Sequence, residues 1–350
     1  MSARSHVTLE EIARAAEVSV ATASRVLSGG PRYVRPQLRD RVEAAAAKLA
    51  YTPNAHAQAL AGGASRTVGV VCHDVSDPYF AAIVRGVMQV AGDNQLLVML
   101  ASTFRDAERE IAYVSMLRAQ RARAILLIGS GFQDRDWEHA MATELEPYLA
   151  GGGRVAAVSR HPNLPVDCVL PANRSGAAAL ARVLLSLGHR RFAVLSGPPV
   201  LTTVADRLTG FRNGLASAGV CLADTDIVHG PFTRDGGHAA MRELISRGLR
   251  ATCVFAVTDV MAIGALAALR EHGIAVPDEV SVAGFDDIPI VRDLTPALTT
   301  VALPLLRIGE RAMELALTED PGSRRRVYRA AGEVVVRSST ASPSDRRAGT

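Results

Sequence analysis

The chain has 350 residues, of which 48% are hydrophobic, so it can bury a substantial core and we expect more than one domain. Residues 1–66 carry the whole formal net charge of +4, since they hold nine Lys and Arg residues against five acids. No apolar run approaches the roughly 20 residues of a membrane span, and the N-terminus lacks the apolar stretch of a signal peptide. We therefore expect a cytoplasmic protein with no membrane partner.

The first predicted elements are two short helices. Thr8 followed by Glu11 is a capping box, which predicts a helix that ends near Glu17. Ser19 has the side chain of a helix cap and predicts a second helix over Val20–Leu27. Two small helices separated by so short a turn are typical of a helix-turn-helix.

A third helix is predicted from Pro36 to Leu49, because proline is favoured at a helix start and the apolar residues recur at helical spacing. The excess of basic residues in this part of the chain suits contact with phosphates. An ordinary three-helix packing module without a nucleic-acid partner would show the same pattern.

Residues 53–63 predict a short hinge helix. Pro53 and Asn54 indicate a stop and a cap, and Gly62 and Gly63 end the helix after barely two turns. A helix this short is not stable alone in water, because nucleation costs more than so few hydrogen bonds return. It needs a partner, or it is a plain linker helix that packs on the next domain.

The stretches VSVATASRVLSG (residues 18–29) and AYTPNAHAQALAGG (residues 50–63) resemble the LacI/GalR family of bacterial transcription regulators, and the resemblance continues to about Ser339. It implies a homodimer on a near-palindromic operator in double-stranded DNA, with the second helix in the major groove and paired hinge helices in the minor groove. The DNA-contacting residues implied are Thr8, Ser19, Val20, Ala21, Thr22, Ser24, Arg25, Asn54, Ala57, Leu60 and Ala61.

Arg25 is the residue that we expect to contribute most to base recognition. A guanidinium can pair with guanine O6 and N7, worth roughly 1–3 kcal/mol of discrimination, whereas the small apolar Val20 and Ala21 can only touch a thymine methyl. Thr22 and Ser24 are expected to hold phosphates. The alternative for Arg25 is an ion pair that faces solvent.

From Val68 onward, short apolar runs alternate with helical stretches, which predicts an α/β fold of two doubly wound subdomains after the all-α head and hinge helix. The predicted strands are VGVVCHDV, LLVMLAST, AILLIGS, VAAVSR, FAVLSG, DIVHG, CVFAVT, SVAGFD, a strand within ALTTVAL and a final strand within VYRAAGEVVVRSS. The resemblance implies a periplasmic-binding-protein type of fold. The domains expected are a helix-turn-helix domain (1–52), a hinge (53–66), an effector-binding and dimerisation domain (67–340, divided into 67–170 plus 290–325 and 171–289 plus 326–340), and a disordered tail (341–350).

An effector site is expected beyond the carboxyl ends of the strands, where ligands bind in such sheets. Arg207 begins the ADRLTGF helix at a position where the family's arginine contacts effector, and Asp286 matches a family aspartate. An Arg–Asp pair with aromatic rings suits a sugar or sugar derivative. The effector residues expected are Tyr79, Phe80, Ser159, Arg160, Arg207, Phe232, Thr258, Asp259 and Asp286. Arg207 with Asp286 could instead be a structural ion pair, and Tyr79 and Phe80 could be core.

The chain departs from the family at several effector positions. Thr258–Asp259 stands where sugar-responsive members commonly have Asn-Asp, and Asp259 could simply cap the following helix. Leu201 stands where the purine-binding branch has arginine, which disfavours a purine. Arg160 together with Arg207 could face a carboxylate or phosphate of an anionic sugar.

The enzyme alternative finds no support in motifs. The only lysine, Lys48, lies in the head, so the α/β region holds no P-loop lysine, and GxGxxG, GxSxG and HExxH are absent. The nine histidines form no cluster with metal-ligand spacing, and the four cysteines indicate core residues, not a disulfide frame or metal site. We expect no cofactor. A solute receptor of the same fold, without DNA recognition, would require an export signal.

Leu60→Ala tests the hinge. We expect this variant to keep its fold but to lose the DNA kink and most of its specific affinity, because an apolar wedge unstacks the central base step and bends the duplex. A mobility or fluorescence assay measures both quantities. Unchanged bending and affinity would refute the wedge.

Overall fold

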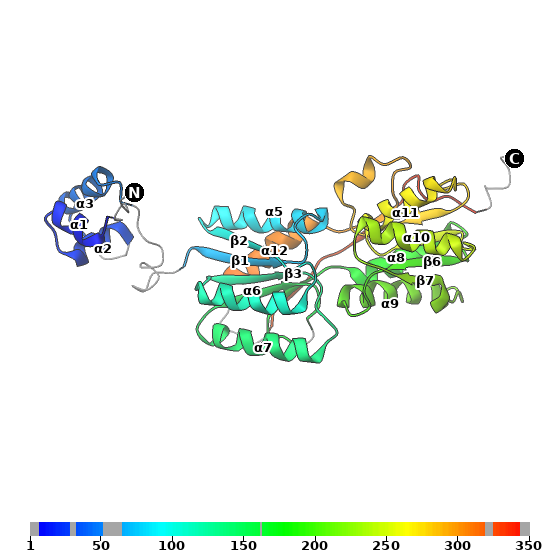
Figure 1. The fold of residues 1–350 in the computed structure, drawn as a ribbon, viewed down its shortest axis with the longest axis horizontal. Coiled ribbons are helices and arrows are strands. Elements are labelled where there is room, and N and C mark those ends of the chain that lie inside the picture. Colours follow the sequence, from blue (N-terminus) through cyan, green and yellow to red (C-terminus); the bar gives the residue numbers. More distant parts are fainter. Residues whose placement is uncertain (1–6, 29–32, 52–64, 162, 319–324, 344–350) are drawn as a thin grey trace, which may run out of the picture. The chain divides into compact units, whose positions relative to one another are not determined.

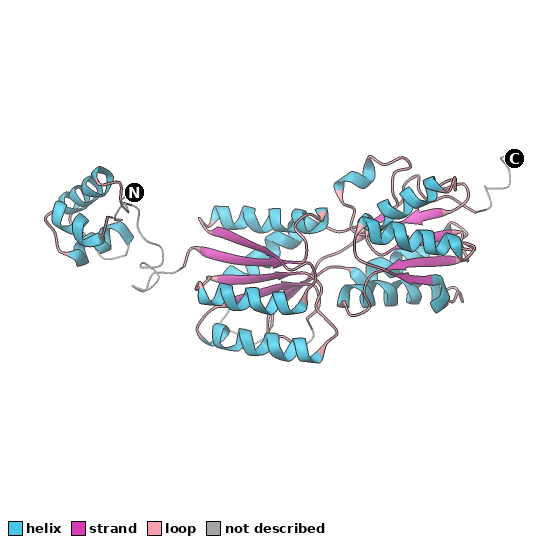
Figure 2. Ribbon diagram, viewed as in Figure 1, coloured by secondary structure: helices cyan, strands magenta, loops and turns pink. Residues whose placement is uncertain are grey.

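The computed structural model describes residues 7–28, 33–51, 65–161, 163–318 and 325–343 (Figure 1). Contacts divide the chain into two compact units, residues 1–66 and 67–350. The first unit is helical, and the second alternates strands and helices (Figure 2). No helix among the described residues is long and apolar enough to cross a membrane.

The described residues of the small unit form three helices: α1 (Leu9–Ala15), α2 (Val20–Ser28) and α3 (Pro36–Lys48). The predicted capping box is present, because the Thr8 hydroxyl accepts from the Glu11 amide and the Glu11 carboxylate accepts from the Thr8 amide. Helix α1 ends at Ala15, two residues earlier than predicted, since Glu17 adopts a positive φ of 49°. Helices this short depend on packing for their stability. The core that supplies it consists of Ile12, Ala13, Ala16, Ala23, Val42, Ala45 and Ala46.

The large unit begins with a six-stranded parallel sheet in the order β11-β5-β4-β3-β1-β2. Its strands are β1 (Thr67–Cys72), β2 (Leu97–Ser102), β3 (Ala124–Ile128), β4 (Arg154–Val158), β5 (Asp167–Leu170) and β11 (Val327–Arg329). Helices α5 (Pro78–Asp93) and α12 (Leu305–Leu317) lie on one face of this sheet, and α6 (Ala107–Ala119) and α7 (Arg135–Ala150) lie on the other (Figure 1). Strand β3 is buried along its whole length, as expected of a strand covered on both faces.

A second parallel sheet has the order β7-β6-β8-β9. Its strands are β6 (Phe192–Ser196), β7 (Ile227–His229), β8 (Cys253–Ala256) and β9 (Ser281–Ala283). Helices α8 (Asn173–Ser186) and α9 (Thr202–Ala216) pack against each other, as do α10 (Arg234–Ser246) and α11 (Asp259–Glu271). Two short 3₁₀ helices, η1 (Asp224–Asp226) and η2 (Pro289–Arg292), and the antiparallel pair β10 (Thr300–Ala302) with β12 (Glu333–Val335) complete the unit.

The strands after residue 290 are divided between the two sheets differently from the prediction. Residues 290–325 were assigned to the first subdomain, but β10 follows the second sheet, since Thr299 and Ala302 bridge to Ala283 and Asp286. Conversely, β11 was assigned to the second subdomain but pairs with β5 of the first sheet. The predicted single final strand is therefore two strands, β11 and β12. Apolar periodicity identifies a short strand but does not say which sheet it joins.

Two further details differ from the sequence analysis. Strand β5 was not anticipated, because DCVL is short and begins with a charged residue. A disordered tail was predicted from residue 341, but the Ala341 amide donates to the Ser281 hydroxyl at 3.2 Å, so that prediction is wrong for Ala341. Residues 344–350 lie outside the described residues. Cys72, Cys168 and Cys253 are buried in strands β1, β5 and β8, which confirms them as core residues. Cys221 is exposed, so the expectation of a core residue is wrong at that position.

Glycines bring α5 and α12 into backbone contact, although the two helices are more than 200 residues apart in sequence. A Cβ on Gly86 of α5 would collide with the Leu306 carbonyl, and a Cβ on Gly309 of α12 would collide with the Ile83 carbonyl. Each helix therefore presents glycine where the other presents backbone. The first sheet is covered on this face only when both helices are in place.

Helix α6 buries a carboxyl group in the core. Glu110 is 2% exposed, and its Oε2 has no hydrogen-bond partner among the described residues. Burial raises the pKa of Glu110 to about 8, so the folded protein holds this side chain neutral at a pH where the unfolded chain ionises it.

Replacing Glu110 with Gln should therefore stabilise the protein in a pH-dependent way. As pH rises from about 4.5 to about 8, the unfolded chain gains free energy by ionising Glu110, so wild type loses stability relative to Glu110→Gln. The loss amounts to at most roughly 1.4 kcal/mol per pH unit. Urea denaturation across this range measures it, with the exposed Glu108→Gln as control. A difference between Glu110→Gln and wild type that does not change with pH would contradict this account.

Candidate functional site

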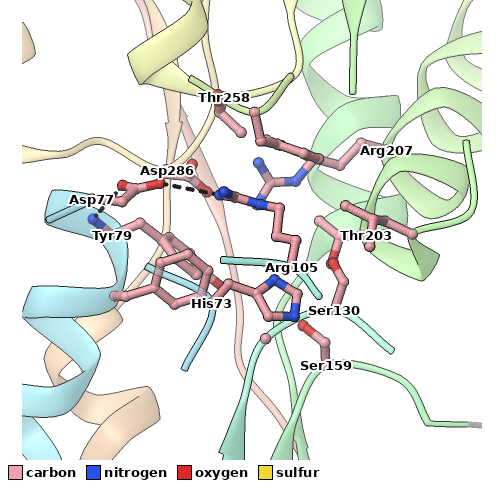
Figure 3. Close-up of a pocket in the computed structure, with 14 residues that line it drawn as sticks. His73, Asp77, Tyr79, Arg105, Ser130, Ser159, Thr203, Arg207, Thr258 and Asp286 are labelled. Carbon is pink, nitrogen blue, oxygen red and sulfur yellow. Dashed lines mark hydrogen bonds and ion pairs between the residues drawn. The ribbon is translucent and has the colours of Figure 1, made fainter. Parts of the chain in front are cut away.

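A pocket lies at the carboxyl ends of the strands of both sheets in the large unit (Figure 3). Its cavity volume is about 30 Å³, far below the roughly 300–1,000 Å³ of typical ligand pockets. In this conformation side chains fill the pocket, so a ligand requires some of them to move. The lining residues are His73, Asp77, Tyr79, Phe80, Arg105, Gly129, Ser130, Ser159, Leu201, Thr203, Arg207, Phe232, Thr258 and Asp286.

Strand ends place most of these side chains. In parallel α/β sheets the segments after the strands gather at one edge, which explains why residues far apart in sequence meet here. His73, Arg105, Ser130 and Ser159 follow β1, β2, β3 and β4, while Phe232, Thr258 and Asp286 follow β7, β8 and β9. Tyr79 and Phe80 begin α5, where Asp77 caps the helix by accepting from the Tyr79 amide at 3.0 Å.

Arg207 is the most buried charge of the pocket, at 1% exposure. Its Nε donates to Asn173 Oδ1 at 2.9 Å, and one terminal nitrogen donates to the Val257 carbonyl at 2.5 Å. The other terminal nitrogen donates to Asp286 Oδ1 at 2.6 Å. The guanidinium lies 4.0 Å from the centre of the Phe285 ring. These contacts replace the water that burial removes and fix the orientation of the side chain.

Arg207, Gly210 and Phe211 of the ADRLTGF helix form an R-x-x-G-F motif, and each of the three residues has a separate role. Arg207 points into the pocket (Figure 3). Gly210 lets α9 approach α8, because a Cβ there would collide with the Arg174 carbonyl. Phe211 stacks on Phe255 of β8 at 4.6 Å in the core. The motif therefore couples the position of the arginine to the packing of the second sheet.

Asp286 is held in an unusual backbone conformation. Its φ is 120°, a region that favours glycine, and its amide donates to the Val301 carbonyl at 2.9 Å. Burial raises the pKa of Asp286, and the Arg207 guanidinium opposes this effect by stabilising the charged carboxylate. Backbone strain of this kind costs about 1–3 kcal/mol and is common at ligand sites.

The opposite wall contains a histidine that stays neutral. Burial, reinforced by Arg105 and His161, lowers the pKa of His73 to about 3. Its Nε2 has no hydrogen-bond partner among the described residues. At physiological pH the His73 ring therefore offers one unpaired, uncharged nitrogen at the pocket.

The structure brings seven of the nine expected effector residues together at the pocket: Tyr79, Phe80, Ser159, Arg207, Phe232, Thr258 and Asp286. Both open alternatives have a structural counterpart, since Arg207 and Asp286 do form an ion pair and Phe80 is 5% exposed. Tyr79 contacts Phe80 edge to face at 5.0 Å.

Arg160 and Asp259 do not line the pocket, so their expected positions are corrected. Arg160 pairs with Asp206, Nε to Oδ2 at 3.2 Å, and its side chain is 40% exposed. Asp259 is fully buried and accepts from the Thr300 hydroxyl at 2.6 Å and the Ile288 amide at 2.9 Å. It does not cap α11 either, because Thr258 does so by accepting from the Met261 amide.

Sequence reasoning missed the polar residues His73, Asp77, Arg105, Ser130 and Thr203. Four of them follow β1, β2 or β3 within a few residues, so the strand-end rule that identified Asp286 could have found them as well. Thr203 lies one turn before Arg207 on α9.

In the small unit, α2 exposes one face to solvent. Ala23 is buried in the core, while Ser19, Val20, Ala21 and Arg25 are exposed, and Thr22 and Ser24 are half-buried. The Arg25 Nε donates to the Ala21 carbonyl at 3.0 Å, a bond that directs the side chain along its own helix. Thr8 lies exposed at the start of α1. Asn54, Ala57, Leu60 and Ala61 of the expected hinge lie outside the described residues.

A helix-turn-helix unit followed by two parallel-sheet subdomains around a pocket defines a DNA-binding transcriptional regulator. Residues 8–54 match the model of bacterial regulatory proteins of the lacI family, and residues 181–340 match that of a periplasmic binding protein-like domain. With the full-length likeness given next, the chain belongs to the lacI family.

The chain is 39% identical over 317 residues, 91% of both proteins, to the HTH-type transcriptional regulator GalS of Salmonella typhimurium. It is 30% identical to the regulator CelR in its cellobiose complex, with a TM-score of 0.67, covering 95% of this chain and 100% of that one. The lac repressor dimer bound to operator and the anti-inducer ONPF is 25% identical, with a TM-score of 0.82, covering 96% and 99%. These relatives are named as regulators and not as enzymes.

Removing one partner of the buried ion pair should destabilise the protein strongly. Arg207→Met leaves Asp286 buried without its counter-charge, which typically costs about 3–5 kcal/mol. Adding Asp286→Asn should restore part of the loss, because the carboxylate is then removed as well. Urea denaturation gives the free energies, and Arg160→Met at the exposed pair should cost less than about 1 kcal/mol. Equal losses in Arg207→Met and Arg160→Met would show that the pair contributes nothing.

Proposed function

We propose that the protein represses transcription by binding a near-palindromic DNA operator as a homodimer, under the control of a small-molecule effector in the pocket. The observation that carries the DNA-binding part is the exposed face of α2, which presents Val20, Ala21 and Arg25 on a unit that holds the chain's whole excess of positive charge. Ser19, Thr22, Ser24 and Thr8 supply hydroxyls for phosphates.

In this proposal the chain is divided by function. Residues 1–52 recognise bases, residues 53–66 form the hinge, and residues 67–340 bind effector and dimerise. The hinge residues that contact DNA are Asn54, Ala57, Leu60 and Ala61. The site of action is the bacterial cytoplasm, at the chromosome, and the protein performs no catalytic reaction.

Strand β2 supplies a surface for the dimer. It forms an edge of the first sheet, and Leu97, Met99 and Leu100 are 67%, 40% and 43% exposed. Met88 on the adjacent α5 is 55% exposed. An apolar edge strand of this length is a liability unless it is covered, and a second copy related by a two-fold axis would cover it. The operator-bound lac repressor is likewise a dimer.

A sugar or sugar derivative is the effector that the pocket chemistry supports best. Arg207 and Asp286 offer a donor and an acceptor for hydroxyl groups, and Phe232 and Tyr79 offer rings for the apolar face of a pyranose. The related CelR has been determined as a cellobiose complex. An effector that binds one conformation of the cleft more tightly than the other favours that conformation. The resulting change in DNA affinity is limited by the difference between the effector's affinities for the two conformations.

Selection of bound sequences from a random duplex pool by the full chain tests the DNA-binding part. We expect a near-palindrome, and Arg25→Gln should weaken binding to it by roughly 5- to 150-fold, equivalent to the loss of one bidentate base contact. Arg39→Gln, which removes the same charge from the exposed side of α3, is the matched control. No enriched sequence, or equal losses in both variants, would contradict base recognition by Arg25.

The affinity of the protein for the selected operator is then measured with candidate effectors to test the effector class. A carbohydrate that occupies the pocket should change operator affinity by roughly 5- to 150-fold, the usual range of allosteric coupling. A response to purines with none to any carbohydrate would contradict a sugar effector while leaving the DNA-binding part intact.

A further inference from the structure

The second arginine of the pocket, Arg105, has few of its bonding requirements met. Its side chain is 16% exposed, and its contact with a carboxylate is an ion pair to Asp77 at 3.8 Å, beyond hydrogen-bond distance. Among the described residues its guanidinium makes no hydrogen bond, whereas Arg207 makes three. Burial accordingly lowers the pKa of Arg105. Five N–H donors of a largely buried cation are thus available at the pocket.

The loop after β2 fixes Arg105 in this position. Phe104 and Arg105 have positive φ angles of 55° and 64°, a conformation that side-chain-bearing residues seldom adopt in succession. The Phe104 amide donates to the His73 carbonyl and the Arg105 amide to the Thr103 hydroxyl. As a result Phe104 is 61% exposed to solvent while Arg105 turns toward the pocket (Figure 3). The two strained residues of this loop therefore direct the Arg105 guanidinium into the pocket.

Aromatic rings and uncharged polar groups surround the guanidinium. Its central carbon lies 5.3 Å from the centre of the Phe232 ring, which belongs to the second subdomain, and 5.9 Å from that of Phe80 in the first. His73 is neutral, and Ser130 and Ser159 add hydroxyls to the same pocket. None of these neighbours brings a negative charge.

The pocket contains two arginines and two aspartates, but only one Arg–Asp pair is in hydrogen-bond contact. Asp286 is engaged by Arg207 at 2.6 Å, so it is not available to Arg105. Asp77 is tied to the start of α5, because its Oδ1 accepts from the Tyr79 amide and holds the carboxylate in place. Asp74 is bound to the Ser76 hydroxyl at 2.6 Å. The charges of Asp77 and Asp74 both act on Arg105, but among the described residues neither carboxylate hydrogen-bonds its guanidinium. An anion that reaches the guanidinium directly therefore stabilises it.

We propose that the effector carries an anionic group, a carboxylate or a phosphate, that pairs with the Arg105 guanidinium while the rest of the molecule lies against Phe232 and the Arg207–Asp286 pair. This inference rests on the proposed effector pocket and specifies its ligand. It also replaces the arginine pair expected from the sequence, since Arg160 is engaged by Asp206 outside the pocket. On binding, the guanidinium shifts from its place between the rings and makes room for the ligand.

Binding of three carbohydrate probes to the full chain tests the proposal. The probes are a neutral hexose, the matching hexuronate and the matching hexose 6-phosphate, measured by calorimetry with wild type, Arg105→Gln, Arg105→Lys and the control Arg160→Gln. Wild type should bind one anionic probe at least about 10-fold more tightly than the hexose, the gain expected of a charge-assisted hydrogen bond. Arg105→Gln should reduce that preference to less than about 3-fold, Arg105→Lys should retain part of it, and Arg160→Gln should leave it unchanged.

The outcomes distinguish the contribution of the anionic group from that of the sugar ring. Equal or tighter binding of the neutral hexose by wild type would overturn the proposal, and so would equal losses for hexose and anionic probes in Arg105→Gln. Inorganic phosphate and a simple dicarboxylate form a further arm. If these anions bind in an Arg105-dependent way and no carbohydrate binds, the effector carries an anionic group but is not a sugar. If no probe of any kind binds, both the proposed effector class and its charge are wrong.

Discussion

The need to bury a guanidinium without water determines how the pocket of this protein is built. Arg207 is 1% exposed, and a charge so buried is tolerated only where its hydrogen bonds are replaced. Its partners come from three different places in the chain: Asn173 at the start of α8, the Val257 carbonyl after β8, and Asp286 after β9. Each of these segments must therefore be in its native position for the arginine to be stable. The Arg207–Asp286 ion pair therefore depends on the native arrangement of the second sheet, and that arrangement depends on the ion pair.

Neutralisation of Arg207 has a consequence for recognition. Because Asp286 cancels its charge, this wall of the pocket can bond hydroxyl groups without selecting for the charge of a ligand. In the binding mode that we propose, selection for charge falls to the opposite wall, where the carboxylate of Asp77 lies 3.8 Å from Arg105. The two arginines thus have the same chemistry but different tasks, and the difference comes from the distance of the nearest carboxylate in each case.

Sequence predicted the elements of this protein better than their assembly. Buried parallel strands are continuous apolar runs, so nearly all of them were identified. The family resemblance placed Arg207 at the pocket, and the resemblance together with the strand-end rule placed Asp286 there. The assignment of β10 and β11 failed because three-residue strands carry no signal of their partner. Arg160 was wrongly expected in the pocket because Asp206, 46 residues away, engages it. Arg105 lies three residues after β2, where the strand-end rule could have found it. The two successive left-handed residues that aim it into the pocket include no glycine that would have marked the turn.

The backbone contact between α5 and α12 bears on the order in which the protein can fold during synthesis. The four strands of the second sheet lie within residues 192–283, so they can pair once that stretch has left the ribosome. The first sheet begins at residue 67 but lacks α12 and β11 until residue 329 has been made. The surface of α5 around Gly86 therefore stays uncovered until α12 has been synthesised. Both subdomains therefore depend on the end of the chain. If synthesis stops after residue 300, the first sheet lacks α12 and β11, and β9 of the second sheet lacks the hydrogen bonds that Ser339 and Ala341 make to Val282 and Ser281.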